Sequence, residues 1–179
     1  MPVGEDQAPL VEQTNEIVRR INATADRDVL PEARAVIPSS GRLPGIDGEA
    51  KMSKSGGNAI PLFASSDMIS AAVRAMFTDP SHLRVEDPGR VEGNVIFTYL
   101  DAFDEDHTEL EEMKAHYRRG GLGDSKIKRH LEDILQALLA PIRQRRAELA
   151  AEPAYVWGII RNGTAKARER TETTRHEVI

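Results

Sequence analysis

The segment 124–150 reads DSKIKRHLEDILQALLAPIRQRRAELA and gives the strongest helical signal in the chain. Its apolar residues recur every three or four positions, as they do along one face of a helix. Pro141 lies inside the segment and has no N–H to donate, so we expect it to kink or divide the helix. The predicted apolar face consists of Ile127, Leu131, Ile134, Leu135, Leu138 and Ile142. The chain is therefore predicted to be mainly α-helical.

Shorter helical patterns flank this segment. Residues 67–76 carry an apolar stripe that ends before Pro80, and residues 95–103 suggest another short helix. Thr108 and Glu111 have the spacing of a capping box, and Gly120 with Gly121 supplies a C-cap. A last helix is predicted over residues 153–176, in which Trp157 is interpreted as a core or interface anchor.

The amino-terminal region predicts one more helix. Residues 7–25 have a helical period, and the Asp6 carboxylate is a plausible N-cap for the first turn. Pro2 and Val3 could end a strand, and Ala33–Ile37 could form a short one. The face predicted to be apolar consists of Leu10, Thr14, Ile17, Val18 and Ile21. We therefore expect a short α/β-like beginning, followed by a loop and a helical bundle.

Residues 26–66 have no sustained period and contain many prolines and glycines. Long loops in compact domains are often functional. This one contains Lys51-Met52-Ser53-Lys54-Ser55, followed by Gly56-Gly57-Asn58. Two ammonium groups three positions apart, with hydroxyls between them and glycines behind, suit a polyphosphate. A solvated Lys/Ser loop is the alternative for a generic pair of this kind.

A second candidate segment is Gly4-Glu5-Asp6-Gln7, directly before the first helix. Glycine lets a ligand approach the backbone closely, a carboxylate can hold hydroxyl groups, and Gln7 offers a donor and an acceptor. A simple helix cap explains the same four residues. The segment is therefore informative only together with the lysine-containing loop.

Composition limits the possible classes. The chain has 179 residues, of which 40% are hydrophobic and 30% charged, as in an ordinary soluble globular protein. The absence of cysteine excludes disulfides and thiolate metal sites and fits the cytoplasm. No apolar run reaches the length of a membrane span, and the five histidines have no metal-binding spacing. The net charge is −5, so any RNA contact must depend on local basic stripes.

The order of the motifs resembles that of the tryptophanyl-tRNA synthetases, a family of class I aminoacyl-tRNA synthetases. PVGEDQ at residues 2–7, a helix, PEA at 31–33 and KMSKS at 51–55 occur in the family's order. The resemblance covers essentially all 179 residues and corresponds to the family's C-terminal half. It continues through Thr78-Asp79-Pro80, Asp87-Pro88-Gly89, Tyr99–Phe103, Tyr117 and Leu139–Arg143.

The resemblance implies a fold and an activity. Residues 1–66 would be the remnant of a Rossmann-type α/β nucleotide-binding catalytic domain, and residues 67–179 a helical anticodon-binding domain. The activity would be ATP-dependent activation of tryptophan, with Mg²⁺, and its transfer to tRNA in protein biosynthesis. The lysines Lys51 and Lys54 would be catalytic, because they would neutralise the departing pyrophosphate.

The resemblance also implies the ligand contacts. ATP would be bound by Gly4, Asp6, Lys51, Met52, Ser53, Lys54 and Ser55. Tryptophan would be bound by Val3 and Gln7, and no residue is expected to hold a resident metal ion. Basic residues of the helical region could contact tRNA phosphates, or could simply solvate an outer face. They are Arg118, Arg119, Lys126, Lys128, Arg129, Arg143, Arg145 and Arg146.

The family's other half carries the HIGH-type motif, and no HIGH-like string occurs in these 179 residues. Catalysis requires both substrates to be held in register, so we expect the chain alone to be inactive. Residues 1–60 are expected to be loosely held or covered by another chain. A homodimer and a complementing amino-terminal half are the possible protein assemblies. Three hypotheses remain: a piece of the ligase, a non-catalytic tRNA-binding or regulatory module, and a residual reading frame without function.

Overall fold

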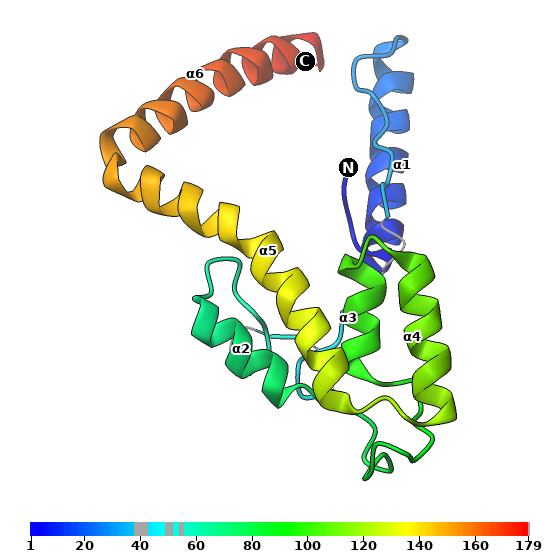
Figure 1. Ribbon diagram of the computed structural model, residues 1–179. Coiled ribbons are helices and arrows are strands. Elements are labelled where there is room, and N and C mark those ends of the chain that lie inside the picture. Colours follow the sequence, from blue (N-terminus) through cyan, green and yellow to red (C-terminus); the bar gives the residue numbers. More distant parts are fainter. Residues whose placement is uncertain (38–42, 49–51, 54–55, 179) are drawn as a thin grey trace. The chain divides into compact units, whose positions relative to one another are not determined.

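The computed structural model describes residues 1–37, 43–48, 52–53 and 56–178, and these residues are mainly α-helical (Figure 1). They divide into two compact units, which we describe separately. Unit 1 comprises Met1–Arg42 and Glu148–Ile179, and unit 2 comprises Leu43–Ala147. The predicted mainly helical class is confirmed. The described residues contain no strand, and their one isolated β-bridge joins Pro2 to Val36 in parallel.

Helix α1 of unit 1, Ala8–Ala25, confirms the first predicted helix but not its cap. The chain enters through a 3-10 turn, Glu5–Gln7, so Gln7 rather than Asp6 occupies the N-cap position. The predicted apolar face is also largely wrong. Leu10 and Ile17 are 54% and 55% exposed, whereas Val11, Asn15 and Val18 are the buried residues of the helix.

The last predicted helix is confirmed as α6, Pro153–Val178. None of its described residues is buried. Trp157 is 60% exposed, so its interpretation as a core anchor is wrong, and an interface role stays a prediction. A residue of this size is rarely left in water without a partner.

Unit 2 contains α2 (Ser66–Ala75), α3 (Val95–Phe103), α4 (His107–Arg119) and most of α5 (Asp124–Ala151). Helices α3 and α4 lie side by side (Figure 1). The predicted stripe of α2 is buried at Ile69, Val73 and Met76, and α3 is buried on most of its surface. The core cluster of this unit consists of Ala64, Ile69, Val73, Met76, Val91, Val95, Ile96, Phe97, Tyr99, Leu100, Leu110, Tyr117, Leu122, Ile127, Leu131, Leu135 and Leu139.

The ends of α4 show one wrong prediction and one confirmed prediction. Asp106 is the N-cap, because its carboxylate accepts the backbone N–H groups of Thr108 (3.1 Å) and Glu109 (2.9 Å). The capping box predicted from Thr108 is therefore absent. Gly120 is the C-cap with φ 84°, and a Cβ there would lie 2.2 Å from the Glu86 carbonyl oxygen. Only glycine fits this position.

Helix α5 continues through Pro141 without being divided, although the proline cannot donate to the carbonyl of Ala137. Its buried residues are Ile127, Leu131, Leu135 and Leu139, at intervals of four positions. Leu138 and Ile142 are 44% and 39% exposed, so the predicted face is correct only along the first part of the helix. None of the described helices is long and apolar enough to cross a membrane.

Candidate functional site

The predicted site residues are distributed over both units. Val3, Gly4, Asp6 and Gln7 belong to unit 1, whereas Met52 and Ser53 belong to unit 2. The predictions for Lys51, Lys54 and Ser55 fall outside the described residues.

The amino-terminal group is held by a tight turn before α1. The Gln7 N–H donates to the Gly4 carbonyl (3.0 Å), and the Gln7 side-chain amide donates to the Asp6 carboxylate (3.1 Å). A Cβ at Gly4 would lie 2.7 Å from Asp6 Oδ1, so glycine leaves room for this carboxylate. Asp6 and Gln7 are both exposed. Their polar atoms lie at the solvent-facing start of a helix, where a ligand can reach them.

Two asparagines of α1 hold the segment that follows the helix, and sequence reasoning missed both. Asn15 accepts from the Ala33 N–H (2.8 Å) and donates to the Ala33 carbonyl (2.9 Å), so its amide mimics a neighbouring strand. Asn22 makes the corresponding pair of bonds with Leu30. Asparagine is unfavourable inside helices, and residues seven positions apart lie on the same helix face. Asn15 and Asn22 together were therefore the sequence signal for a polar contact on that face.

An ion pair extends this row of contacts. Arg19 lies between the two asparagines in sequence, and its guanidinium donates to both carboxylate oxygens of Glu32 at 2.9 Å. These hydrogen bonds lower the pKa of Glu32. Glu32 is the middle residue of the PEA motif, so this motif is fastened to α1 by its side chain and by the backbone of Ala33.

The described part of the KMSKS segment is organised by Asn58. The Asn58 side-chain oxygen accepts the Ser53 N–H (2.9 Å), and its amide donates to both Asp47 oxygens (3.2 and 3.0 Å). Asn58 is only 5% exposed. The Gly56 N–H donates to Ser53 Oγ (3.0 Å) and closes a turn within the segment. Two backbone donors are thus used internally, and the Ser53 hydroxyl donates no hydrogen bond to another described residue.

The same loop is anchored in the core of unit 2. The Phe77 N–H donates to the Ile46 carbonyl (2.9 Å), and the Tyr99 hydroxyl donates to the Pro44 carbonyl (3.0 Å). Burial, together with the nearby Asp47 carboxylate, raises the pKa of Tyr99 to about 12. A Cβ at Gly45 would lie 2.3 Å from the Asn58 amide nitrogen, so the close approach requires glycine. The base of the loop is therefore a fixed platform.

Asp47 and Asn58 were missed as organising residues. The Asp47-Gly48 pair is a turn signal, and Gly48 has φ 85°. Asn58 follows two glycines, where an amide that bridges two turns is plausible from its chemistry. Their mutual contact could not be found, because they are eleven positions apart without a regular element between them.

Half of the basic residues singled out in the helical region hold the fold together. Lys128 donates to the carbonyls of Arg74 (2.7 Å) and Met76 (2.9 Å) at the end of α2, and burial lowers its pKa. Arg143 donates to the Ala64 carbonyl (3.2 Å), and Arg118 donates to Glu92 (2.8 Å). The Arg146 guanidinium lies 4.9 Å from the centre of the Phe63 ring.

The four remaining basic residues are all exposed: Arg119, Lys126, Arg129 and Arg145. Within the described parts of the chain, no carboxylate or carbonyl pairs with Arg119, Lys126 or Arg129. Arg145 interacts with other residues. Among the described residues of α4 and α5, the cations that are both exposed and unpaired are therefore fewer than the count of Lys and Arg indicates.

The histidines include one buried polar cluster. His82 Nδ1 lies 2.9 Å from Asp124 Oδ1, and the Tyr117 hydroxyl donates to the same oxygen (2.8 Å). The His82 side chain is 2% exposed and its ring packs against Tyr117 at 4.6 Å, which fits the predicted packing role. Among residues 1–37, 43–48, 52–53 and 56–178, no group of three or more His, Asp and Glu could hold a metal ion.

Comparisons with known proteins agree on one family. The family described as tRNA synthetases class I (W and Y) matches residues 1–140. The tryptophan–tRNA ligase of Clostridium longisporum is 56% identical over 180 residues, covering 99% of this chain and 53% of the relative. The ligase of Streptococcus pneumoniae serotype 4 is 50% identical over 183 residues, with 99% and 54% covered.

Solved structures give the same result. The crystal structure of tryptophanyl-tRNA synthetase from Campylobacter jejuni, complexed with ADP and tryptophan, superimposes with a TM-score of 0.71 at 28% identity. The superimposed part covers 99% of this chain and 54% of the Campylobacter chain. The Giardia lamblia tryptophanyl-tRNA synthetase gives a TM-score of 0.66 at 25% identity, with 82% and 35% covered.

The matching motifs and fold thus define the class of protein: the class I aminoacyl-tRNA synthetases of the tryptophan and tyrosine group. Within that class, the chain belongs to the tryptophanyl-tRNA synthetase family, as its sequence predicted. The chain spans about half the length of the curated relatives that it matches.

Proposed function

We propose that the chain is the C-terminal portion of a tryptophan–tRNA ligase, which activates tryptophan with ATP and transfers it to tRNA. The observation that carries the proposal is the alignment of 99% of the chain with just over half of the Campylobacter enzyme complexed with ADP and tryptophan. The braced loop around Ser53 supports it, because a phosphate-binding loop needs a fixed base.

The chemistry assigns a role to each part of the loop. The tryptophan carboxylate would attack the α-phosphorus of ATP, forming a new P–O bond while the bond to the pyrophosphate oxygen breaks. Negative charge grows on the departing pyrophosphate, and Lys51 and Lys54 would neutralise it. The Ser53 hydroxyl, with Met52 and Ser55, would complete the phosphate contacts. The hydrogen bonds of Asn58 would hold this loop before ATP arrives.

The start of α1 would bind the other ends of the substrates. Gly4 and Asp6 would lie beside the ATP ribose, and Val3 and Gln7 would contact tryptophan. The exposure of Asp6 and Gln7 supports this assignment. The Asp6 carboxylate accepts a hydrogen bond from the Gln7 amide, and this bond would orient the Gln7 side chain toward the amino group of tryptophan.

We assign no protein ligands to Mg²⁺. The described residues offer no cluster of carboxylates or histidines for a metal ion, so the ion would be carried in with the ATP phosphates. No step above depends on it. We further propose that residues 1–66 are the remnant of the Rossmann-type catalytic domain and that residues 67–179 bind the tRNA anticodon. Arg119, Lys126 and Arg129 are exposed on α4 and α5 and could meet RNA phosphates.

The proposal is tested by complementation. The chain is co-expressed with the half of the Clostridium longisporum ligase that it does not match, and tryptophan-dependent exchange of pyrophosphate into ATP is measured. We expect exchange to appear only when both halves are present. The Lys54→Ala variant should lower the rate by about 100-fold or more. Lys166→Ala, which removes an exposed ammonium from α6, is the matched control and should leave the rate unchanged.

The absence of exchange from a purified, folded mixture of the two halves would contradict the proposal. The alternative, a non-catalytic RNA-binding module, is favoured by one observation: unit 2 has a core of its own. Filter binding of tRNA across a salt series distinguishes the two. Salt-dependent tRNA binding by the chain, without exchange activity in the mixture, would support the module.

A further inference from the structure

The loop that contains KMSKS is closed at its base by Asn58. The Asn58 side-chain oxygen accepts the Ser53 N–H (2.9 Å), and its backbone carbonyl accepts the Ile46 N–H (3.0 Å). The Asn58 side-chain nitrogen donates to both carboxylate oxygens of Asp47 (3.2 and 3.0 Å). Asn58 is 5% exposed, so these bonds form away from water. One buried residue therefore joins the segment before the motif to the middle of the motif.

The direction of the Asn58 amide decides whether this junction can form. If the amide were flipped, its NH₂ group would face the Ser53 N–H and its oxygen would face the Asp47 carboxylate. Neither contact is a hydrogen bond, because an amide nitrogen only donates and an ionised carboxylate only accepts. Buried polar groups without partners are costly, so the flipped amide is disfavoured. The Asp47 carboxylate therefore sets which end of the Asn58 amide meets Ser53.

The segment that carries Asp47 is itself fixed to the core of unit 2. The Ile46 carbonyl accepts the N–H of Phe77, which follows α2 (2.9 Å). The Gly48 backbone lies so close to the Phe77 ring that a Cβ on Gly48 would lie 3.1 Å from it. The residues on both sides of Asp47 are thus held against the same core segment. The Asp47 carboxylate has a fixed position from which it can orient Asn58.

Ser53 lies between Lys51 and Lys54 in the sequence, so fixing its backbone would constrain the start of both lysine side chains. We propose that Asp47 is a positioning residue of this loop, which acts through Asn58 on the Ser53 backbone and prepares the loop for pyrophosphate. This inference rests on the proposed function. Asp47 touches no substrate in this role, because a carboxylate repels a polyphosphate. Its positioning effect on pyrophosphate binding is therefore opposite in sign to the effect of its charge.

The difference in sign provides the test. Binding of inorganic pyrophosphate to the full chain is measured by isothermal titration calorimetry, without a partner half. Asp47→Asn removes a negative charge near a polyanion, so charge alone would strengthen binding. The new amide can present either an oxygen or a nitrogen to Asn58 and no longer fixes its direction. We therefore expect Asp47→Asn to weaken pyrophosphate binding about fivefold.

Exchanging the two side chains should restore binding. Asn58→Asp alone places a carboxylate oxygen where the Asn58 nitrogen now lies, 3.0 Å from Asp47, and should weaken binding at least about tenfold. The double variant, with Asp47→Asn and Asn58→Asp together, has the net charge of the unaltered chain. Its new carboxylate can accept both the Ser53 N–H and an N–H of the new amide. Binding by the double variant should return to within about twofold of the unaltered value.

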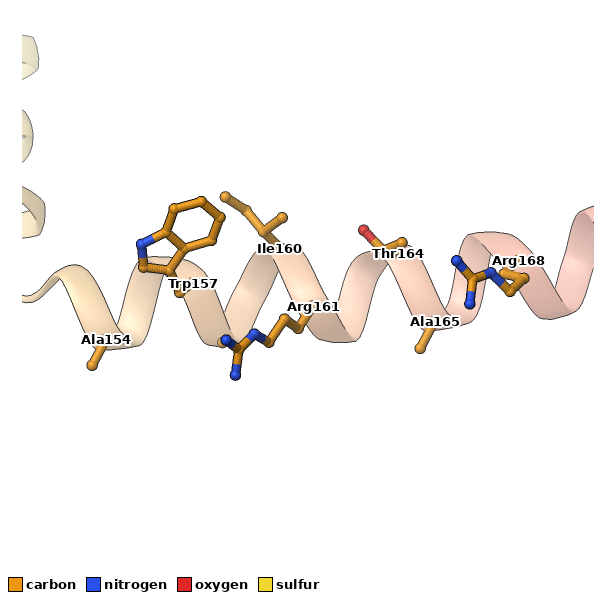
Figure 2. Close-up of a pocket in the computed structure, with 8 residues that line it drawn as sticks. Ala154, Trp157, Ile160, Arg161, Thr164, Ala165 and Arg168 are labelled. Atoms are coloured by element: carbon orange, nitrogen blue, oxygen red, sulfur yellow. The ribbon is translucent and has the colours of Figure 1, made fainter.

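Two control variants separate the loop from the other charges of the chain. Arg161 carries an exposed guanidinium on α6 (Figure 2), and Arg161→Ala should leave pyrophosphate binding unchanged. Asp133→Asn is the matched control for Asp47→Asn, because it removes a carboxylate from an exposed position of α5 and should not weaken binding. Urea unfolding followed by circular dichroism identifies the temperature at which every variant is folded, and the titrations are made there.

The outcomes separate the inference from the proposed function. Weaker binding by folded Asp47→Asn, with recovery in the double variant, supports the positioning role. Binding by Asp47→Asn that equals or exceeds that of the unaltered chain overturns it. So does a double variant that binds no better than Asn58→Asp, which decides the question even if Asp47→Asn does not fold. Failure of the unaltered chain to bind pyrophosphate also overturns the inference, because a loop held by Asp47 should bind without the partner half. Exchange activity in the complementation assay would then still support the proposed function.

Discussion

The two units differ in what holds them together. The core cluster of unit 2 brings together side chains from Ala64 to Leu139, many of them fully buried. Within the described residues of unit 1, the buried apolar side chains are Val11 and Val18. Apolar burial is the main favourable term in folding, so unit 2 carries most of the stability of the chain.

Polar contacts replace the core in unit 1. Asn15 and Asn22 pair with the backbone of residues 29–33, and Arg19 pairs with Glu32. Hydrogen bonds of this kind fix a geometry but contribute little net stability, because the same groups bond to water in the unfolded chain. Polar side-chain contacts therefore fix the geometry of unit 1 but add little to its stability. In unit 2, buried apolar side chains both fix the geometry and stabilise the fold.

The largest expected difference between the units comes from one substitution made in each. Ile127→Ala removes a side chain that is fully buried in α5 and should lower the free energy of unfolding by about 2–5 kcal/mol. Ile160→Ala is the matched change at a position in α6 that is 49% exposed, and it should cost below about 0.5 kcal/mol. Urea unfolding followed by circular dichroism measures both. Equal losses would show that the units share one core.

Two buried amides sharpen the comparison at a smaller scale. Asn58 of unit 2 and Asn15 of unit 1 are 5% and 6% exposed, and each joins two backbone segments. Asn58→Ala leaves the Ser53 N–H without its acceptor and should lower the stability of unit 2 by about 1–3 kcal/mol. Asn15→Ala should raise the amide hydrogen-exchange rate of Ala33 while the unfolding midpoint of unit 2 stays the same. A common loss of midpoint in both variants would contradict independent units.

The same contrast explains what the sequence could reveal. The positions of α2, α3 and α5 were predictable, because their apolar residues recur every three or four positions. Buried faces were predictable only in unit 2, where apolar stripes meet a core. In α1 the apolar residues Leu10 and Ile17 point to solvent and Asn15 is buried, which reverses the rule that the face prediction used.

The candidate site was predictable as a motif but not as a geometry. The letters KMSKS indicate phosphate chemistry, yet nothing in them shows that Asn58 links the Ser53 backbone to the Asp47 carboxylate. The prediction of the α4 cap was wrong for a similar reason. Asp106 and Thr108 are both candidates for the N-cap position, and the Asp106 carboxylate accepts two N–H groups at once. Pairings that join segments without a regular period leave no pattern in the sequence.

Alkaline pH should act on the anchor between the loop and the core. The pKa of Tyr99 is raised to about 12 from the ordinary 10.0, so the folded state holds the proton where the unfolded state releases it. This contribution to stability is complete below pH 10 and is lost as the pH rises toward 12. Tyr99→Phe should cost about 1 kcal/mol at neutral pH, because the Pro44 carbonyl loses its donor. Its unfolding midpoint should then fall less steeply above pH 10 than that of the unaltered chain, and parallel curves would contradict the assignment.

Acid should distinguish two carboxylates, one in each unit, that both have lowered pKa values. The Asp79 pKa is lowered by the Ser81 hydroxyl first and then by the N–H groups of Ser81 and Arg90, and the residue is 8% exposed. Its stabilisation is present above the ordinary pKa of 3.8 and is lost as the pH falls through the lower pKa of the folded state. Asp79→Asn should therefore flatten the acid limb of the unfolding curve.

Glu32 is the counterpart in unit 1, where the Arg19 hydrogen bonds lower its pKa but the pair is open to water. Solvent and salt screen an exposed ion pair, so removing it changes stability little even when the pKa is shifted. Glu32→Gln should leave the acid limb of the unfolding curve unchanged within the error of the measurement, although it replaces a carboxylate with an amide just as Asp79→Asn does. If Glu32→Gln flattened the limb as much as Asp79→Asn, the stability of unit 1 would be coupled to that of unit 2. The difference between the units would then lie in their shape and not in their energetics.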